Sequence, residues 1–119
     1  MKTANELIGY LFEVRDTVHI LHLKTNSYAQ HIALNELYDG LLDLTDDIAE
    51  TYQGKYGLLN IPSVITKSTT DAIEYVADVV SKIEASKSVF KPEDTHLLNI
   101  LDEIIALFYK QLYKLRHLK

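Results

Sequence analysis

Cysteine is absent from the 119 residues of this chain. Without it there is no disulfide framework, no thiolate zinc site and no thiol nucleophile. Two prolines and four glycines leave long segments that nothing interrupts, and no apolar run is long enough to cross a bilayer. These absences exclude disulfide-stapled, thiol-dependent and membrane-spanning proteins, and they favour a protein built from long helices.

Positive charge is the scarcer sign, because 12 Lys and Arg stand against 17 Asp and Glu, a net charge of −5. A negative surplus argues against a nucleic-acid coat, so we expect DNA contact to be weak or absent. The N-terminal residues turn polar at once, so we expect no signal peptide and a cytoplasmic protein. Cations gather in the last turns, where they also complement a helix dipole: Lys110, Lys114, Arg116, His117 and Lys119.

The apolar residues recur at three- and four-residue spacing, which is the period of a helix with one buried face. This pattern predicts four helices, over residues 3–24, 27–53, 69–86 and 92–117. The length is that of one domain with a core of its own. The predicted fold class is all-α, a four-helix bundle that forms a single domain over residues 1–119.

The connection between the second and third predicted helices, residues 54–67, is long and apolar. The second helix would be about 40 Å long, and some 14 residues of extended chain reach roughly 46 Å. The connection is therefore long enough to run back along the bundle. We predict one long crossover instead of simple up-down-up-down wiring; the alternative is a loosely packed loop.

Two of the helices carry more apolar surface than one bundle contact needs. The first has a second, weaker stripe that contains Ile8, Phe12 and His19. The fourth is apolar over a wide arc: Leu97, Leu98, Ile100, Leu101, Ile104, Ile105, Leu107, Phe108, Leu112 and Leu115. Exposed apolar surface on this scale is a liability in a monomer. We therefore predict a homo-oligomer, at least a two-fold dimer.

A row of side chains with metal-ligand chemistry runs along the second helix. At 100° per residue they share one stripe beside the main apolar stripe: His31, Asn35, Asp39, Asp46 and Glu50. Leu42 and Ala49 lie among them, which suits a contact with another helix or subunit. A solvated polar face is the alternative at each position, since soluble helices commonly carry Asp, Glu and Asn outside.

Other catalytic signatures are missing. The sequence has no zinc-protease motif, no serine elbow, no Gly-rich phosphate loop and no nucleotide fingerprint. One Glu-x-x-His motif occurs, Glu93 to His96, but the second motif that a di-iron site in a bundle needs is absent. We interpret it as a helix cap.

Five side chains have the spacing of a ligand set: His19, His31, Asn35, Asp46 and Glu50. This spacing resembles that of the mini-ferritins, the starvation-inducible DNA-protecting (Dps) family, in which a His ends the first helix and a His, two Asp and a Glu follow on the second. Residues 32–40, 47–50 and 112–118 also resemble that family. The resemblance implies a ferritin-like bundle, an oligomeric shell, and a ferroxidase site for iron that two subunits share.

In that reading, His19 and His31 of one subunit and Asp46 and Glu50 of another would hold the iron. Asn35 stands where the family has Asp, so the site loses one negative charge.

A register shifted by four residues places Asn35 at the second His and Asp39 at the Asp. In this shifted register only Asp39, or Asp39 together with Glu50, still matches a ligand of the family. Two functions stay open: a mini-ferritin that binds, oxidises and stores iron, and a non-catalytic ferritin-like bundle that acts as an oligomeric binding or structural protein.

Overall fold

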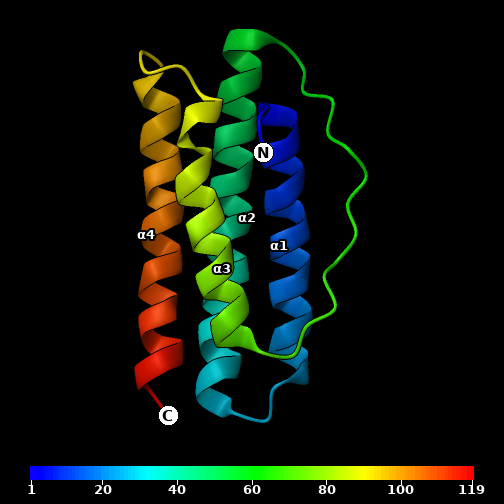
Figure 1. The fold of residues 1–119 in the computed structure, drawn as a ribbon, viewed down its shortest axis with the longest axis vertical. Helices are drawn as coiled ribbons and strands as arrows, with labels where there is room; N and C mark the ends of the chain where they lie inside the picture. The colour runs from blue at the N-terminus through cyan, green and yellow to red at the C-terminus, as the bar shows by residue number, and fades with distance from the viewer.

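The structure, a computed structural model, describes all residues 1–119. It contains four α-helices and one short 3₁₀ helix, with no strand. In chain order these are α1 (Ala4–Lys24), α2 (Tyr28–Tyr56), α3 (Ala72–Ala85), η1 (Ser86–Val89) and α4 (Thr95–His117). The long helices lie side by side (Figure 1), so the predicted all-α four-helix bundle is confirmed. None of the helices is long and apolar enough to span a bilayer.

Polar side chains mark where three of the helices begin. The Thr3 hydroxyl accepts a hydrogen bond from the Glu6 amide, as an N-cap side chain does, and donates one to the Glu6 carboxylate. The Ser27 hydroxyl accepts from an amide in the first turn of α2, and the Asp71 carboxylate does so for α3. These bonds satisfy amides that have no partner inside their own helix.

The helix boundaries differ by three residues or fewer from the predicted ones. Helix α2 runs past Gly54 and ends at Gly57, whose φ of 94° lies in the left-handed region that glycine adopts most readily. Helix α3 begins at Ala72 because Asp71 caps it. Helix α4 begins at Thr95, and Asp94, two residues after Pro92, stands at the cap position without a side-chain hydrogen bond to the helix.

The segment between α2 and α3 is the predicted crossover. Figure 1 shows it running along the outside of α1, so that α2 and α3 point the same way. Its backbone amides donate to side chains at three places: Leu59 to Gln53, Asn60 to Asn5 and Lys67 to Thr17. Its packing on α1 is close, since a Cβ added to Gly9 would lie 3.0 Å from Pro62 Cγ.

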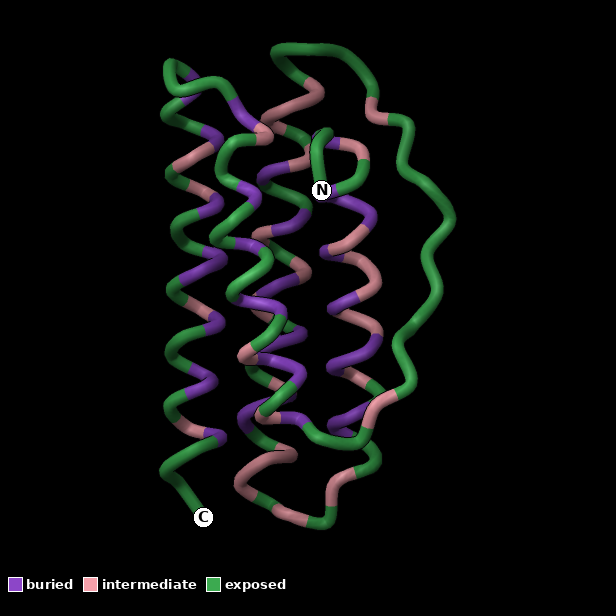
Figure 2. The backbone as a smooth tube through the Cα atoms, viewed as in Figure 1, coloured by how far each residue is buried: buried purple, intermediate pink, exposed green.

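One core holds the bundle together. It is a single cluster of 27 buried apolar residues, which Figure 2 shows on the inward faces of all four helices. Helices α2 and α4 approach closely where a Cβ on Gly40 would meet Leu107 at 3.0 Å.

The core also covers the apolar faces from which the homo-oligomer was predicted. Ile8 is 1% exposed, and Phe12 packs against the core. In the wide arc of α4 no side chain is exposed. Those two faces are accounted for within one protomer, and the homo-oligomer itself stays a prediction.

Candidate functional site

Two stacked histidines join the end of α1 to the start of α2. The rings of His22 and His31 are 3.6 Å apart between centroids and nearly parallel. The His22 Nδ1 lies 2.7 Å from the His31 carbonyl, and the His31 Nδ1 lies 2.9 Å from the His22 carbonyl. Because a carbonyl only accepts, both rings carry their proton on Nδ1. The short turn after Lys24 makes α1 and α2 antiparallel and brings these two positions opposite each other.

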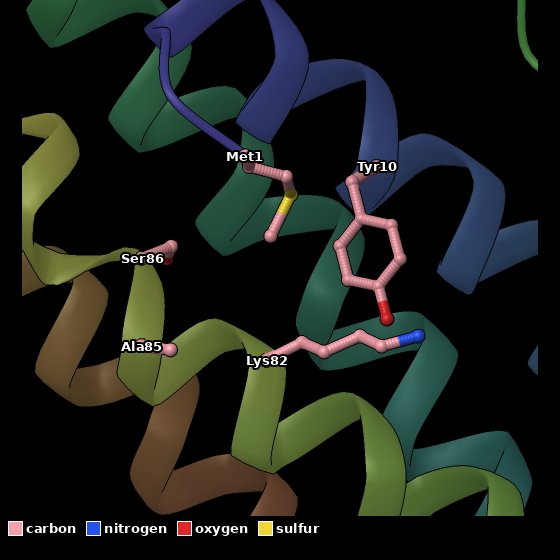
Figure 3. A pocket seen from close by; sticks show the side chains of 5 residues that line it. All are labelled: Met1, Tyr10, Lys82, Ala85 and Ser86. Carbon is pink, nitrogen blue, oxygen red and sulfur yellow. The ribbon is translucent and has the colours of Figure 1, made fainter.

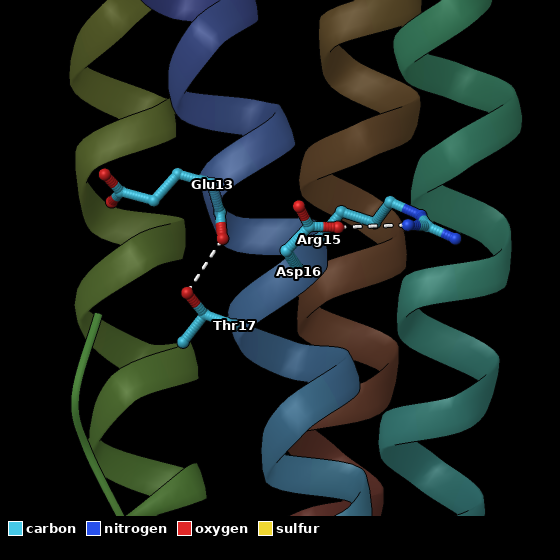
Figure 4. A network of polar contacts seen from close by, with 4 residues as sticks. All are labelled: Glu13, Arg15, Asp16 and Thr17. Carbon is cyan, nitrogen blue, oxygen red and sulfur yellow. Dashed lines mark hydrogen bonds and ion pairs between the residues drawn. The ribbon is translucent and has the colours of Figure 1, made fainter. Parts of the chain in front are cut away.

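A second stacked pair lies next along the same helices. The His19 ring stacks on Tyr38 at 4.0 Å between centroids, and the Arg15 guanidinium lies 6.0 Å from the centre of the Tyr38 ring. Arg15 also forms an ion pair with Asp16 at 3.0 Å, drawn in Figure 4 beside the hydrogen bond from the Thr17 hydroxyl to the Glu13 carbonyl. The contacts of His19 and Arg15 with Tyr38 join α1 to α2, whereas the other two lie within α1.

Asn35 is engaged in the same network. Its side-chain oxygen accepts from the Tyr38 hydroxyl at 2.7 Å, and its amide nitrogen donates to Asp39 at 3.2 Å. Both ends of the amide therefore have partners. An Asp at this position could accept from Tyr38, but it could not donate to Asp39.

The predicted ligand residues do not converge within one protomer. Asp46 and Glu50 are exposed on α2, and at 1.5 Å per residue Asp46 lies roughly 22 Å along the helix from His31. No group of three or more His, Asp or Glu is placed to hold a metal ion. A site shared between subunits stays a prediction, since it needs a second copy.

Two parts of this region were missed from the sequence. His22 was not singled out, although it and His31 flank the predicted turn, where antiparallel helices pair. Tyr38 was missed as well, because a tyrosine at a helical spacing from Leu34 and Leu41 is typical of core.

At the other end of the bundle, a buried carboxylate fastens α4 to α2. Asp94 is 1% exposed, and it accepts hydrogen bonds from the Lys55 ammonium and the Tyr56 hydroxyl. These two bonds lower the pKa of the Asp94 carboxyl, and the bond from Lys55 has the larger effect. The Lys91 ammonium lies 5.7 Å from the Tyr56 ring centre. The motif from Glu93 to His96 thus starts a helix, but the Asp94 side chain binds α2 instead of capping α4.

A pocket of about 380 Å³ lies beside the N-terminus and is lined by Met1, Tyr10, Lys82, Ala85 and Ser86 (Figure 3). Burial raises the pKa of the Tyr10 phenol well above its usual value, so the hydroxyl stays protonated at neutral pH. The charged groups of the residues that line this pocket are the Lys82 ammonium and the Met1 α-amino group.

A different kind of surface forms where the α1–α2 turn and the C-terminus meet (Figure 1). We call it the turn end and define it by residues 17–35 and 104–119. These stretches hold five of the twelve Lys and Arg and none of the seventeen Asp and Glu. They also carry exposed apolar side chains: Ile20, Leu23, Tyr28, Ile32, Tyr109, Tyr113 and Leu118.

An apolar pocket of about 330 Å³ opens at the turn end between the first turns of α2 and the end of α4. We call it the α2–α4 pocket. It is lined by Tyr28, Ala29, Ile32, Ala33, Glu36, Lys114, Leu118 and Lys119. Among these, Lys114 binds Glu36 across the pocket rim at 2.6 Å.

Residues 22–115 match a family described as a family of unknown function (DUF5856). The chain belongs to this family. One relative is a protein of Enterobacteria phage T4 described as an uncharacterized 14.6 kDa protein in the mobD-ri intergenic region. It is 31% identical over 114 residues, which cover 94% of this chain and 87% of the T4 protein. No solved structure matches the chain.

Membership in the DUF5856 family overturns the mini-ferritin resemblance, which was wrong. The spacing that suggested it follows from the helical period, which places His, Asn, Asp and Glu on one face of any amphipathic helix. Here His19 and His31 serve the packing of α1 on α2, and Asn35 holds the Tyr38 hydroxyl within α2.

Proposed function

We propose that this protein is a binding protein that contacts another macromolecule through its turn end. The observation that carries the proposal is the composition of that surface. The exposed apolar side chains there include Ile20, Leu23, Tyr28, Ile32, Tyr113 and Leu118. The same two stretches of sequence contain Lys and Arg but no Asp or Glu. Contiguous apolar surface with a charged rim is typical of an interaction site.

The charges at the turn end are available to a partner. Lys24, Lys110, Arg116 and Lys119 form no ion pair within the chain, whereas Lys114 is bound to Glu36. Exposed cations of this kind speed association and select partners by charge.

Site-specific photo-crosslinking in the native host tests the proposal. A photoreactive amino acid is placed at Tyr113 or Leu23 in the turn end, and at Asp78 on exposed α3 as the matched control. We expect discrete crosslinked species from the turn-end positions and none from Asp78. Equal crosslinking at all three positions, or none at any, would remove the support for a dedicated binding surface.

Iron binding between subunits is a second candidate, independent of any mini-ferritin kinship. His31 donates from Nδ1 to a backbone carbonyl, which leaves Nε2 as the ligand nitrogen, the usual orientation of a metal-bound His. Asp46 and Glu50 are exposed and have no hydrogen-bond partner. They could therefore face His19 and His31 of a second copy.

Anaerobic titration with Fe²⁺, followed by admission of air, tests this candidate and any ferroxidase activity. If it is right, Glu50→Ala abolishes binding and Asn35→Asp tightens it, because a carboxylate adds a full charge. Asp47→Ala, an exposed neighbour, is the control. Binding and oxidation no better than in a protein-free sample would exclude the candidate.

The homo-oligomer belongs to the same proposal, since a shared site requires one. Sedimentation velocity at micromolar concentration measures it directly. A two-fold dimer has twice the 13.6 kDa mass of the chain. A single species at the monomer mass would contradict the dimer and, with it, the intersubunit iron site.

A further inference from the structure

We infer that the turn end binds an acidic, amphipathic segment of a partner protein, and that an apolar side chain of that segment enters the α2–α4 pocket. The inference rests on the proposed function and adds the chemistry of the partner. It combines three observations: the pocket, the charge around it and the fixed geometry of its rim.

The pocket has the character of a side-chain receptor. Ala29, Ile32, Ala33 and Leu118 give it apolar walls, and its volume is about 330 Å³. Ala29 and Ala33 are one helical turn apart, and their small side chains leave the hollow between α2 and α4. An apolar side chain of a partner would fill this space and lose its contact with water, which is favourable.

The positive charges around the pocket favour a partner segment with negative charge. Lys119 lines the pocket, and Lys24, Lys110 and Arg116 belong to the same end. Residues 17–35 and 104–119 contain no Asp or Glu. The start of α3, where Asp71 is the N-cap, lies on the Lys24 side, since Thr70 and Ala72 line a pocket with Lys24, so Lys110, Arg116 and Lys119 are the cations on the side of the α2–α4 pocket. A partner with carboxylates beside its apolar anchor would be attracted, and a basic one repelled.

The rim is held in place by the pair between Glu36 and Lys114. The hydrogen bond from Lys114 lowers the pKa of the Glu36 carboxyl, so Glu36 stays ionised and bound to Lys114 at neutral pH. This pair bridges α2 and α4 at 2.6 Å and offers no free negative charge. The remaining cations are then the charges that a partner meets.

A protein segment fits these observations better than a nucleic acid does. A phosphate backbone has no aliphatic group to fill apolar walls, and its affinity comes from many cations along an extended path. The net charge of −5 repels a long polyanion beyond the turn end. An acidic peptide is short enough to remain on the basic surface.

Titration of the isotope-labelled protein with synthetic probes, followed by NMR, tests the inference. The probe is a peptide of about four helical turns with Leu on one face and Glu on the other. Three comparison probes are the same peptide with Lys for Glu, the same peptide with Ala for Leu, and a single-stranded DNA oligonucleotide. We expect saturable binding of the Glu–Leu peptide alone, with the amide shifts centred on Ala29, Ile32 and Leu118.

Two variants with matched controls separate the pocket from the charges. Ala29→Trp fills the pocket and should weaken the Glu–Leu peptide at least tenfold, roughly the effect of losing a buried apolar anchor. Ala85→Trp, at the exposed end of α3 and outside the turn end, should leave binding unchanged. The double variant Arg116→Glu/Lys119→Glu should weaken binding by about tenfold at low salt and by less at high salt. Lys2→Glu/Lys91→Glu makes the same charge change at the other end and should have no such effect.

The inference is overturned if the DNA or the Lys-bearing peptide binds as well as the Glu–Leu peptide. It is also overturned if Ala29→Trp binds normally, or if no probe produces saturable shifts. A failure here differs from a failure of the proposed function. Crosslinks confined to the turn end, without peptide binding, would keep the binding surface and reject only this partner chemistry.

Discussion

At the scale of single residues, the stacked histidines close the end of a helix. The last four carbonyls of α1 have no partner inside that helix, and the His31 Nδ1 proton satisfies one of them, at His22, from the neighbouring helix. His22 returns the bond to His31. The pair thus fixes the angle and the depth at which the chain leaves α1 and enters α2.

Removal of one ring should therefore leave a carbonyl without its donor. We expect His31→Ala to lower the free energy of unfolding by about 1–3 kcal/mol, measured by urea denaturation. His96→Ala, an exposed residue near the start of α4, is the control and should change it by less than about 0.5 kcal/mol. Equal effects of the two substitutions would show that the reciprocal bonds add nothing to stability.

Asp94 is the second residue whose environment sets a measurable property. Hydrogen bonds from Lys55 and Tyr56 lower the pKa of its carboxyl below the ordinary value of 3.8. A carboxyl whose pKa is lower in the folded state stabilises the fold at pH values above its unfolded pKa. This contribution is lost as the pH falls through the folded pKa.

We therefore expect the urea midpoint of the protein to fall as the pH drops below about 4, and to fall less steeply in Asp94→Asn. The variant should be the less stable of the two at neutral pH, and the difference should narrow in acid. Asp47→Asn, at an exposed site without a partner, should retain the full acid dependence. Parallel pH profiles for the protein and Asp94→Asn would contradict this account.

At the scale of elements, the crossover depends on α1 for its conformation. It has no secondary structure, and Thr17 supplies a hydrogen bond to its Lys67 amide at 3.0 Å. Thr17 is buried, with 1% of its surface exposed. Its hydroxyl accepts this bond and donates one to the Glu13 carbonyl. The crossover is thus attached at intervals and is otherwise exposed, as Figure 2 shows.

Thr17→Val keeps the shape of the side chain and removes the hydroxyl. We expect faster tryptic cleavage after Lys67 in the native state, because local opening exposes a peptide bond to the protease. The helical circular dichroism should stay the same. Thr69→Val, within the crossover and without a hydrogen bond from its side chain, is the control. Unchanged cleavage in Thr17→Val would mean that packing on Gly9, rather than this bond, holds the segment.

At the scale of the whole molecule, charge is unevenly distributed. Residues 17–35 and 104–119 carry five cations and no Asp or Glu, although the chain as a whole has a net charge of −5; the start of α3, with Asp71, lies at the same end of the bundle. Local potential, and not net charge, governs encounters with a charged surface at low ionic strength. The α1–α2 turn adds Lys24 to the cations of the C-terminal turns at this end of the bundle.

The protein should accordingly be retained on a cation exchanger at pH 7 and low salt, despite its pI of about 5.4. Arg116→Glu/Lys119→Glu should elute without retention, and Lys2→Glu/Lys91→Glu should still be retained. Elution of all three in the void volume would show that the turn end does not act as one basic surface.

The sequence alone determined the helices, their capping residues and the crossover. These depend on local periodicity, on neighbouring side chains such as Thr3 and Glu6, and on the length that a chain can span. It also placed His31, Asn35 and Asp46 on one stripe of α2, which a helical wheel fixes without any partner.

Only the tertiary structure decided what those side chains touch. A helical wheel gives the direction in which a side chain leaves its helix, but not its partner. The packing of α1 on α2 places His22 against His31 and His19 against Tyr38. The same holds for Asp94, whose carboxylate meets Lys55 across nearly forty residues of sequence. Residues 17–35 and 104–119 lie at the same end of the bundle because α1 and α2 meet at a turn and α4 ends beside the start of α2, a proximity that no local pattern encodes.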